Sequence, residues 1–190
     1  MKKALNFLIA AIIMTIVSIG LTFGMGFVEN AQTALVLVRA VAILSISTSI
    51  VTMIACYFGK AAKNKNFSIA FWINIGMILL NVIVFVFSEI NIEILGLIVT
   101  FNLLNTICSV FTFLFIILGC REAVHSVGKL AITCAVFMGL GLLTVGALQY
   151  VPKLSEDFKA PILSIGSIVF LVGCILFVVL IFKSRARVNK

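Results

Sequence analysis

The chain has 190 residues, of which 63% are hydrophobic and 11% are charged, and its formal net charge is +8 at pH 7. A typical soluble domain is roughly 45–50% apolar and about 25% charged, so a soluble fold of this composition would expose large apolar surfaces. The composition excludes an ordinary soluble enzyme, a disordered chain and an ordinary nucleic-acid-binding domain, and it predicts a polytopic membrane protein.

Six continuous apolar runs follow one another along the chain, each long enough to cross a bilayer as a helix. They lack the alternating pattern of a membrane β-barrel, and in lipid the backbone of such a run must pair with itself. We expect an all-α bundle of six transmembrane helices, arranged as three tandem helical hairpins within one transmembrane domain of residues 1–190. The predicted spans are about 4–25, 34–58, 67–87, 95–119, 130–150 and 161–182.

Small residues at helical spacing occur in the first and fifth spans, where they favour close helix packing. They are Gly20 and Gly24 in the first span, and Ala131, Ala135 and Gly139 in the fifth. Packing within the chain and a seam between two copies are both open. Pro152 and Pro161 bracket the last connection and are expected to help end the flanking helices.

The second span carries Arg39, the one ionisable side chain well inside a predicted span. An intramembrane charge is costly and therefore marks a candidate functional site. With the centre of the span near Leu44, Arg39 lies about 8–9 Å toward the outer surface at 1.5 Å per residue, where it can snorkel or pair with an acid. Structural anchoring and contact with an anionic ligand are both open. The same span is rich in hydroxyls: Ser45, Ser47, Thr48, Ser49 and Thr52.

Asparagines mark one face of each of the next two spans. Asn74 and Asn81 are seven residues apart in the third span, and Asn102 and Asn105 are three apart in the fourth. Such spacings put both side chains of a pair on the same helix face. Because an unpaired amide in hydrocarbon is costly, these faces should turn inward. With Arg39 they form the predicted intramembrane polar site, which is explained either by interhelical hydrogen bonding or by a hydrated cavity.

The charges predict the orientation. Segments 1–3, 59–66, 120–129 and 183–190 would share one side of the membrane and hold eleven of the Lys and Arg residues, whereas segments 26–33, 88–94 and 151–160 hold two. By the positive-inside rule the first side is cytoplasmic, with both termini. We expect this basic face to attract anionic lipids and not nucleic acid, because its charges lie in four short segments without interleaved aromatic residues.

Catalytic patterns are missing from the sequence. The single His125 lies in a predicted connection without an obvious partner, and the five cysteines lie within or at the ends of apolar runs with no CxxC spacing. Neither a zinc site nor a phosphate-binding or dinucleotide-binding glycine pattern is present. The sequence therefore predicts a non-enzymatic chain without cofactor or metal.

The sequence alone favours a small multi-pass membrane subunit or scaffold that packs with partner proteins or with itself. The alternative function is a transporter or solute-binding membrane subunit that uses the polar site. The composition and the absence of targeting features predict a bacterial plasma membrane as its location.

Overall fold

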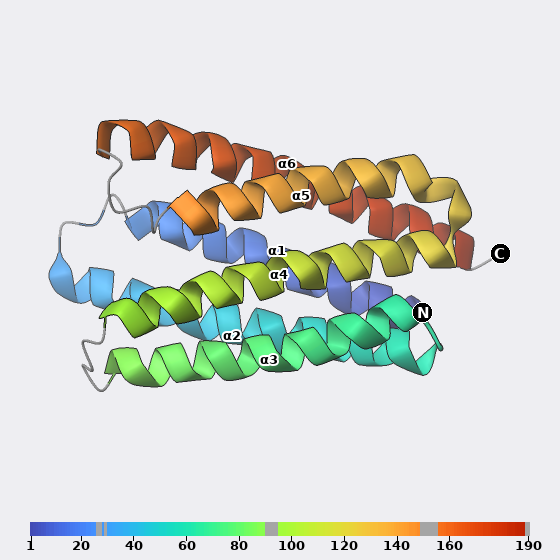
Figure 1. The fold of residues 1–190 in the computed structure, drawn as a ribbon, viewed down its shortest axis with the longest axis horizontal. Helices are drawn as coiled ribbons and strands as arrows, with labels where there is room; N and C mark the ends of the chain where they lie inside the picture. The colour runs from blue at the N-terminus through green and yellow to red at the C-terminus, as the bar shows by residue number, and fades with distance from the viewer. Residues whose placement is uncertain (26–27, 29, 90–94, 149–155, 189–190) are drawn as a thin grey trace.

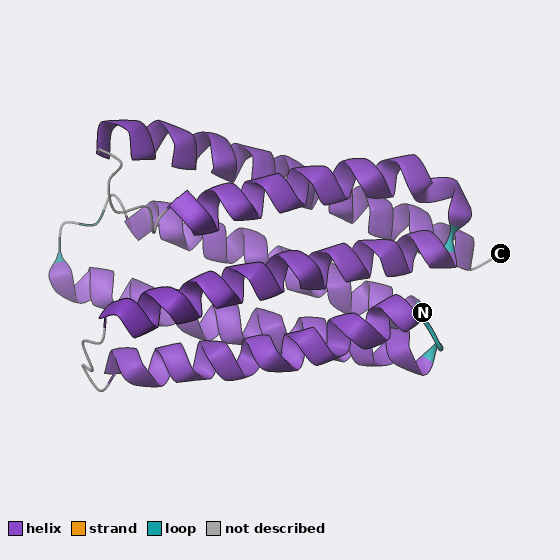
Figure 2. Ribbon diagram, viewed as in Figure 1, coloured by secondary structure: helices purple, strands orange, loops and turns teal. Residues whose placement is uncertain are grey.

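The computed structural model describes residues 1–190 except 26–27, 29, 90–94, 149–155 and 189–190, and this described part is all-helical (Figures 1 and 2). Its helices are α1 (Lys2–Met25), α2 (Ala31–Ala61), α3 (Lys65–Glu89), α4 (Leu95–Ala123), the short 3-10 turn η1 (His125–Val127), α5 (Gly128–Leu148) and α6 (Glu156–Val188). Within the described residues, six helices are long and apolar enough to cross a membrane. The six predicted helices are therefore confirmed as helices, and they fit a multi-pass membrane protein.

The last helix begins earlier than the sequence pattern predicts. We expected Pro161 to mark its start, but α6 begins at Glu156 and contains Pro161. A proline removes one backbone N–H donor and crowds the preceding turn. Pro161 is the sixth residue of α6, beyond the first four N–H groups that have no partner inside a helix, so α6 continues through it with one backbone hydrogen bond fewer near its start. Pro152 lies outside the described residues.

The helices form a ring of neighbours. Each one packs against the next in the chain, α1 packs against α6, and α4 also contacts α6. Figure 1 shows α5 and α6 at the top, α2 and α3 at the bottom, and α1 and α4 between them. The start of α1 and the end of α6 lie at the same end of the bundle, here called the terminal end. Because these contacts link all six helices, the division into three hairpins stays a prediction.

Fully buried apolar side chains concentrate at the terminal end. Most of them come from the first turns of α1 and α3 and from the last turns of α4 and α6. The largest are Leu5, Leu8, Phe67, Ile116, Ile117, Phe177, Leu180 and Ile181, together with Met138 in the middle of α5. Helices in lipid gain little from hiding apolar surface, so they associate through close packing. Among the described residues, this end of the bundle is its closely packed part.

Phe67 is the centre of that packing. Its ring lies between α2 and α4, directly against the backbones of Gly59 and Gly119, where an added Cβ would come closer to the ring than 3.0 Å. Asn64 holds the start of α3 in place: its Nδ2 donates to the Gly119 carbonyl at 3.1 Å, and its Oδ1 accepts from the Phe67 N–H at 3.1 Å. A side chain and two glycines thus join three helices.

We predict that Gly59→Ala and Gly119→Ala each destabilise the folded protein by about 1–3 kcal/mol, because the added methyl group overpacks the Phe67 site. Gly20→Ala and Gly139→Ala are the matched controls, since an added Cβ there meets nothing within 4 Å. Alanine is the better helix former by about 1 kcal/mol, so the controls should be neutral or stabilising. Thermal unfolding in detergent measures both pairs. Equal effects in the two pairs would contradict the packing described above.

Candidate functional site

A polar cavity of about 200 Å³ lies at the centre of the bundle, with residues from all six helices in its wall. Most of the lining is hydroxyl-bearing. The residues are Thr15, Ser18 and Ile19 of α1, Ser45, Thr48, Ser49 and Thr52 of α2, Asn74 and Met77 of α3, Ser109, Thr112 and Phe113 of α4, Leu142 of α5 and Phe170 of α6. The many polar groups around this cavity distinguish the middle of the bundle from the apolar packing at the terminal end.

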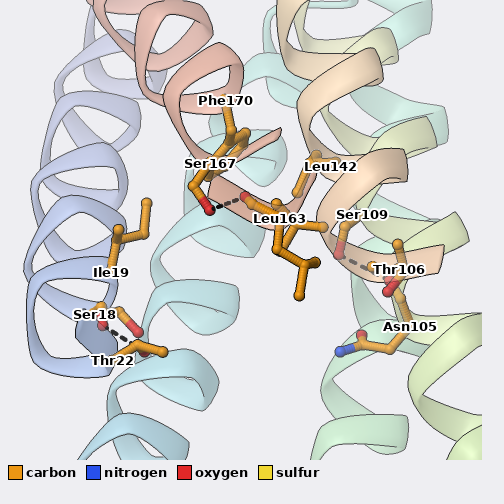
Figure 3. Close-up of a pocket in the computed structure, with 12 residues that line it drawn as sticks. Ser18, Ile19, Thr22, Asn105, Thr106, Ser109, Leu142, Leu163, Ser167 and Phe170 are labelled. Atoms are coloured by element: carbon orange, nitrogen blue, oxygen red, sulfur yellow. Dashed lines mark hydrogen bonds between the residues drawn. The ribbon is translucent and has the colours of Figure 1, made fainter. Parts of the chain in front are cut away.

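A second, partly open cavity of about 570 Å³ adjoins the first one. It is lined by α1, α4, α5 and α6, and it shares Ser18, Ile19, Ser109, Leu142 and Phe170 with the central cavity. Figure 3 shows Ser18, Ile19 and Thr22 of α1 across the space from Asn105, Thr106 and Ser109 of α4, with Leu163 and Ser167 of α6 between them. The second cavity extends away from the terminal end, because Thr22 and Gly146 lie near the ends of helices that start there.

The hydroxyls of the central cavity are held by their own helices. Thr48 donates to the Leu44 carbonyl at 2.8 Å, Thr52 to the Thr48 carbonyl at 2.8 Å, and Thr15 to the Ala11 carbonyl at 2.9 Å. Serine and threonine commonly make this bond to the carbonyl four residues earlier. Each bond uses the single proton of its hydroxyl, so the oxygen still has acceptor capacity.

Asn81 and Asn105 join α2, α3 and α4. The Asn105 Nδ2 donates to the Asn81 Oδ1 at 2.8 Å, and the Asn81 Nδ2 donates to the Ser49 Oγ at 3.3 Å. Ser49 in turn donates to the Ser45 carbonyl at 3.1 Å. These bonds run from the larger cavity, which Asn105 lines, to the central cavity, which Ser49 lines.

Among the described residues, Asn74 is the side chain that the bundle leaves without a partner at both of its polar atoms. It is fully buried in the wall of the central cavity, and neither its Oδ1 nor its Nδ2 has a hydrogen-bond partner. The Asn105 Oδ1 is also buried without a partner. A buried polar group left without a hydrogen bond costs about 1–3 kcal/mol. The buried Asn74 amide therefore lowers the stability of the folded protein, and no hydrogen bond to another helix offsets this loss.

The structure brings only part of the predicted polar site together. Asn74, Asn81 and Asn105 lie at or beside the cavities, but Arg39 lies on an exposed face of α2 and is not among the described residues that line them. The side chain of Asn102 lies outside the described residues, as do the side chains of Glu29, Glu89 and Glu93, the acids near the outer end of α2 and α3 with which Arg39 could pair.

The small residues predicted to pack helices differ among themselves. Ala131 is buried and Ala135 packs against the apolar core, whereas Gly20, Gly24 and Gly139 have nothing within 4 Å of an added Cβ. The close contacts occur at other glycines. They are Gly59 and Gly119 against Phe67, Gly141 against Phe170, Gly146 against Thr106, Gly166 against Thr144, and Gly173 against Met138.

Sequence reasoning missed the hydroxyls of α1 and α4. Thr15 and Ser18 on α1, and Ser109 and Thr112 on α4, complete the polar wall opposite α2. Their spacing in the sequence indicates a shared polar face, because residues three or four apart lie on one helix face. A search for hydroxyl-bearing faces in every span would have found both helices.

The cysteines and His125 do not contribute to this site. Neither cavity has a cysteine or histidine among the described residues that line it. All five cysteines are free, and four of them are buried. In the part of the chain that the structure describes, no group of three or more His, Cys, Asp or Glu side chains could hold a metal ion.

Comparison with known proteins finds no match to a protein family, to a curated protein or to a solved structure. The site must therefore be interpreted from its own geometry.

We predict opposite effects of the same substitution at two positions of α3. Asn74→Leu should stabilise the folded protein by about 1–3 kcal/mol, because it removes an unsatisfied buried amide beside a cavity that can hold the larger side chain. Asn81→Leu should destabilise it by about 1–2 kcal/mol, because interhelical hydrogen bonds in membranes contribute about 0.6 kcal/mol each and the Asn105 amide also loses its partner. Thermal unfolding of the two variants measures the difference, and a destabilised Asn74→Leu would show that the Asn74 amide is bonded.

Proposed function

We propose that this chain is a non-enzymatic multi-pass membrane protein that binds a small solute in its central cavity, as a transporter or as the solute-binding subunit of one. The observation that carries the proposal is Asn74, a fully buried amide with both polar atoms unpaired at the wall of a polar cavity. Function can retain a group that costs stability, and a bound solute would supply the missing hydrogen bonds.

The distribution of packing along the bundle supports the same function. Phe67 and its glycine neighbours fill the terminal end, whereas the cavities occupy the middle and extend away from that end. A site that is closed on the terminal side and extends toward the opposite side fits one state of alternating-access transport.

A packing role as a subunit or scaffold, which the sequence favoured, has less support. It rested partly on Gly20, Gly24 and Gly139, which make no close contact within the chain. Their surroundings fit a seam for another chain, but a scaffold needs neither a polar cavity nor an unsatisfied amide. The solute-binding function accounts for both of those features.

The terminal end is proposed to face the cytoplasm of a bacterial plasma membrane and to contact anionic lipid headgroups. Lys60 lies 4.9 Å from the ring centre of Phe71 and 4.8 Å from that of Trp72, and Tyr57 and Trp72 are exposed beside it. Tyrosine and tryptophan are enriched at membrane interfaces, and lysines there attract anionic lipid. The basic residues counted in the sequence gather at this end.

Thiol labelling in intact cells tests the orientation. A cysteine introduced by Lys65→Cys, at the exposed start of α3, should react with a membrane-impermeant maleimide only after the cells are permeabilised. Gln32→Cys, at the exposed start of α2 and the opposite end of the bundle, should react in intact cells. The reverse pattern would place the termini outside the cytoplasm.

Access of water-soluble reagents to the cavity tests the solute-binding function. Ser167→Cys places a thiol in the wall of the larger cavity, and we expect it to react with a charged methanethiosulfonate reagent at least tenfold faster than Ile168→Cys. Ile168 is the next residue on α6 and is 61% exposed on the outer face, where lipid would keep its thiol protonated and unreactive. The unsubstituted protein gives the background of the five native cysteines.

Equal rates at the two positions would mean that no aqueous path reaches the cavity. The solute-binding function would then fail, and the membrane-subunit function predicted from the sequence would take its place.

A further inference from the structure

The direction of the hydrogen bonds in the central cavity determines which ligands it accepts. A backbone carbonyl has no proton, so a hydroxyl bonded to one must be the donor. Thr15, Thr48, Ser49, Thr52 and Ser109 all bond to the carbonyl four residues earlier. Five hydroxyls of the cavity wall have therefore used their only proton within their own helices.

A sixth hydroxyl of the cavity wall has also donated its only proton within the bundle. Thr112 donates to the Met77 Sδ at 3.4 Å, and a thioether sulfur can only accept. Ser49 also accepts from Asn81, but the other five hydroxyl oxygens have no donor bonded to them in the hydrogen bonds just described. With the Asn74 Oδ1, the cavity wall presents six such acceptor oxygens, against the Asn74 Nδ2 and the hydroxyls of Ser18 and Ser45 as its remaining donors.

Formal charge does not contribute to this wall. None of the described residues that line either cavity is an Asp, Glu, Lys, Arg or His. Because acceptor oxygens outnumber donors in this uncharged wall, it disfavours an anion and favours a ligand rich in N–H donors.

The larger cavity differs in character. Beside its hydroxyls it has Ile19, Leu142, Val145, Leu163 and Phe170 in its wall, which suit an apolar group. Ile19, Leu142 and Phe170 also line the central cavity, so a single ligand can occupy both spaces. The polar end of such a ligand would meet the hydroxyls, and its apolar end would lie toward the larger cavity.

We propose that the cavities bind a protonated primary amine with an apolar body, its ammonium group among the hydroxyl oxygens and the Asn74 Oδ1 and its body in the larger cavity. Removing a charge from water is expensive unless the charge is paired and hydrogen-bonded. In this cavity hydrogen bonds alone would stabilise the ammonium group, which has three protons to donate. The hydroxyl oxygens and the amide oxygen supply more than three acceptors. This inference rests on the proposed solute-binding function and specifies its ligand class.

Three ligands of similar shape test the charge preference: 2-phenylethylamine, 2-phenylethanol and phenylacetate. With the full-length protein in detergent, we expect a saturable rise in Tm of about 5–10 °C at a hundredfold excess over Kd for the amine. The alcohol and the carboxylate should give less than a fifth of that rise. Sodium and potassium chloride, added alone, test whether a bare cation suffices.

Substitutions in the cavity wall test whether the amine binds there. Asn74→Leu and the double substitution Thr48→Val with Thr52→Val should each raise the apparent Kd for the amine at least tenfold. Thr133→Val is the matched control, because Thr133 makes the same bond to the carbonyl four residues earlier but on the exposed side of α5. It should leave the amine shift unchanged. The threonine variants keep side-chain shape, so they test the proposal independently of Asn74→Leu.

Each contrary result has its own meaning. An Asn74-dependent shift with the alcohol or carboxylate as large as that with the amine overturns the ligand class but leaves the solute-binding function standing. An Asn74-dependent shift with sodium or potassium as large as that with the amine assigns the site to a bare cation and overturns the amine. An amine shift that persists in all cavity variants comes from the micelle and overturns the proposal. If no ligand shifts Tm and Ser167→Cys is unreactive, the proposed function fails as well.

Discussion

An amide or hydroxyl inside a bundle of apolar helices has few partners, and that scarcity governs this structure. Serines and threonines find a hydrogen-bond partner within their own helix, by donating to the carbonyl four residues earlier, as Thr48 and Thr52 do on α2. Asparagine has no such local solution for both of its polar atoms. Asn81 is satisfied only because α2 and α4 lie beside α3 and bring Ser49 and Asn105 within reach. The arrangement of three helices is thus tied to one side chain.

Asn74 shows the opposite outcome on the same helix. It is as fully buried as the apolar core, yet the neighbouring helices present no partner to it. Burial without a partner lowers stability, and the cavity beside it is a packing defect that further lowers stability. A bundle selected for stability alone would fill that space with apolar side chains. The combination of a cavity and an unpaired amide is therefore the strongest indication of function in this chain.

The terminal end shows what close packing looks like in the same bundle. Phe67 occupies the space that Gly59 and Gly119 leave free, and Asn64 bonds to the Gly119 carbonyl across the helix junction. Gly141 of α5 and Gly173 of α6 instead allow the backbones of Phe170 and Met138 to approach closely. Because Phe170 also lines both cavities, the backbone contact at Gly141 sets the position of part of the cavity wall. Close packing between α5 and α6 therefore helps to position the polar site.

The six helices could be predicted from the apolar runs alone, because long apolar runs in lipid have no other way to satisfy their backbones. The sequence also predicted inward-facing asparagines, from their spacing and the cost of an exposed amide. The packed bundle was needed to learn that Asn81 and Asn105 bond to each other while Asn74 stays unpaired, since hydrogen bonding between helices depends on rotations and registers that no single helix encodes. The same reason separates the glycines that touch a neighbour, such as Gly119, from those that do not, such as Gly20: a small-residue pattern is local, but the partner it meets comes from another helix.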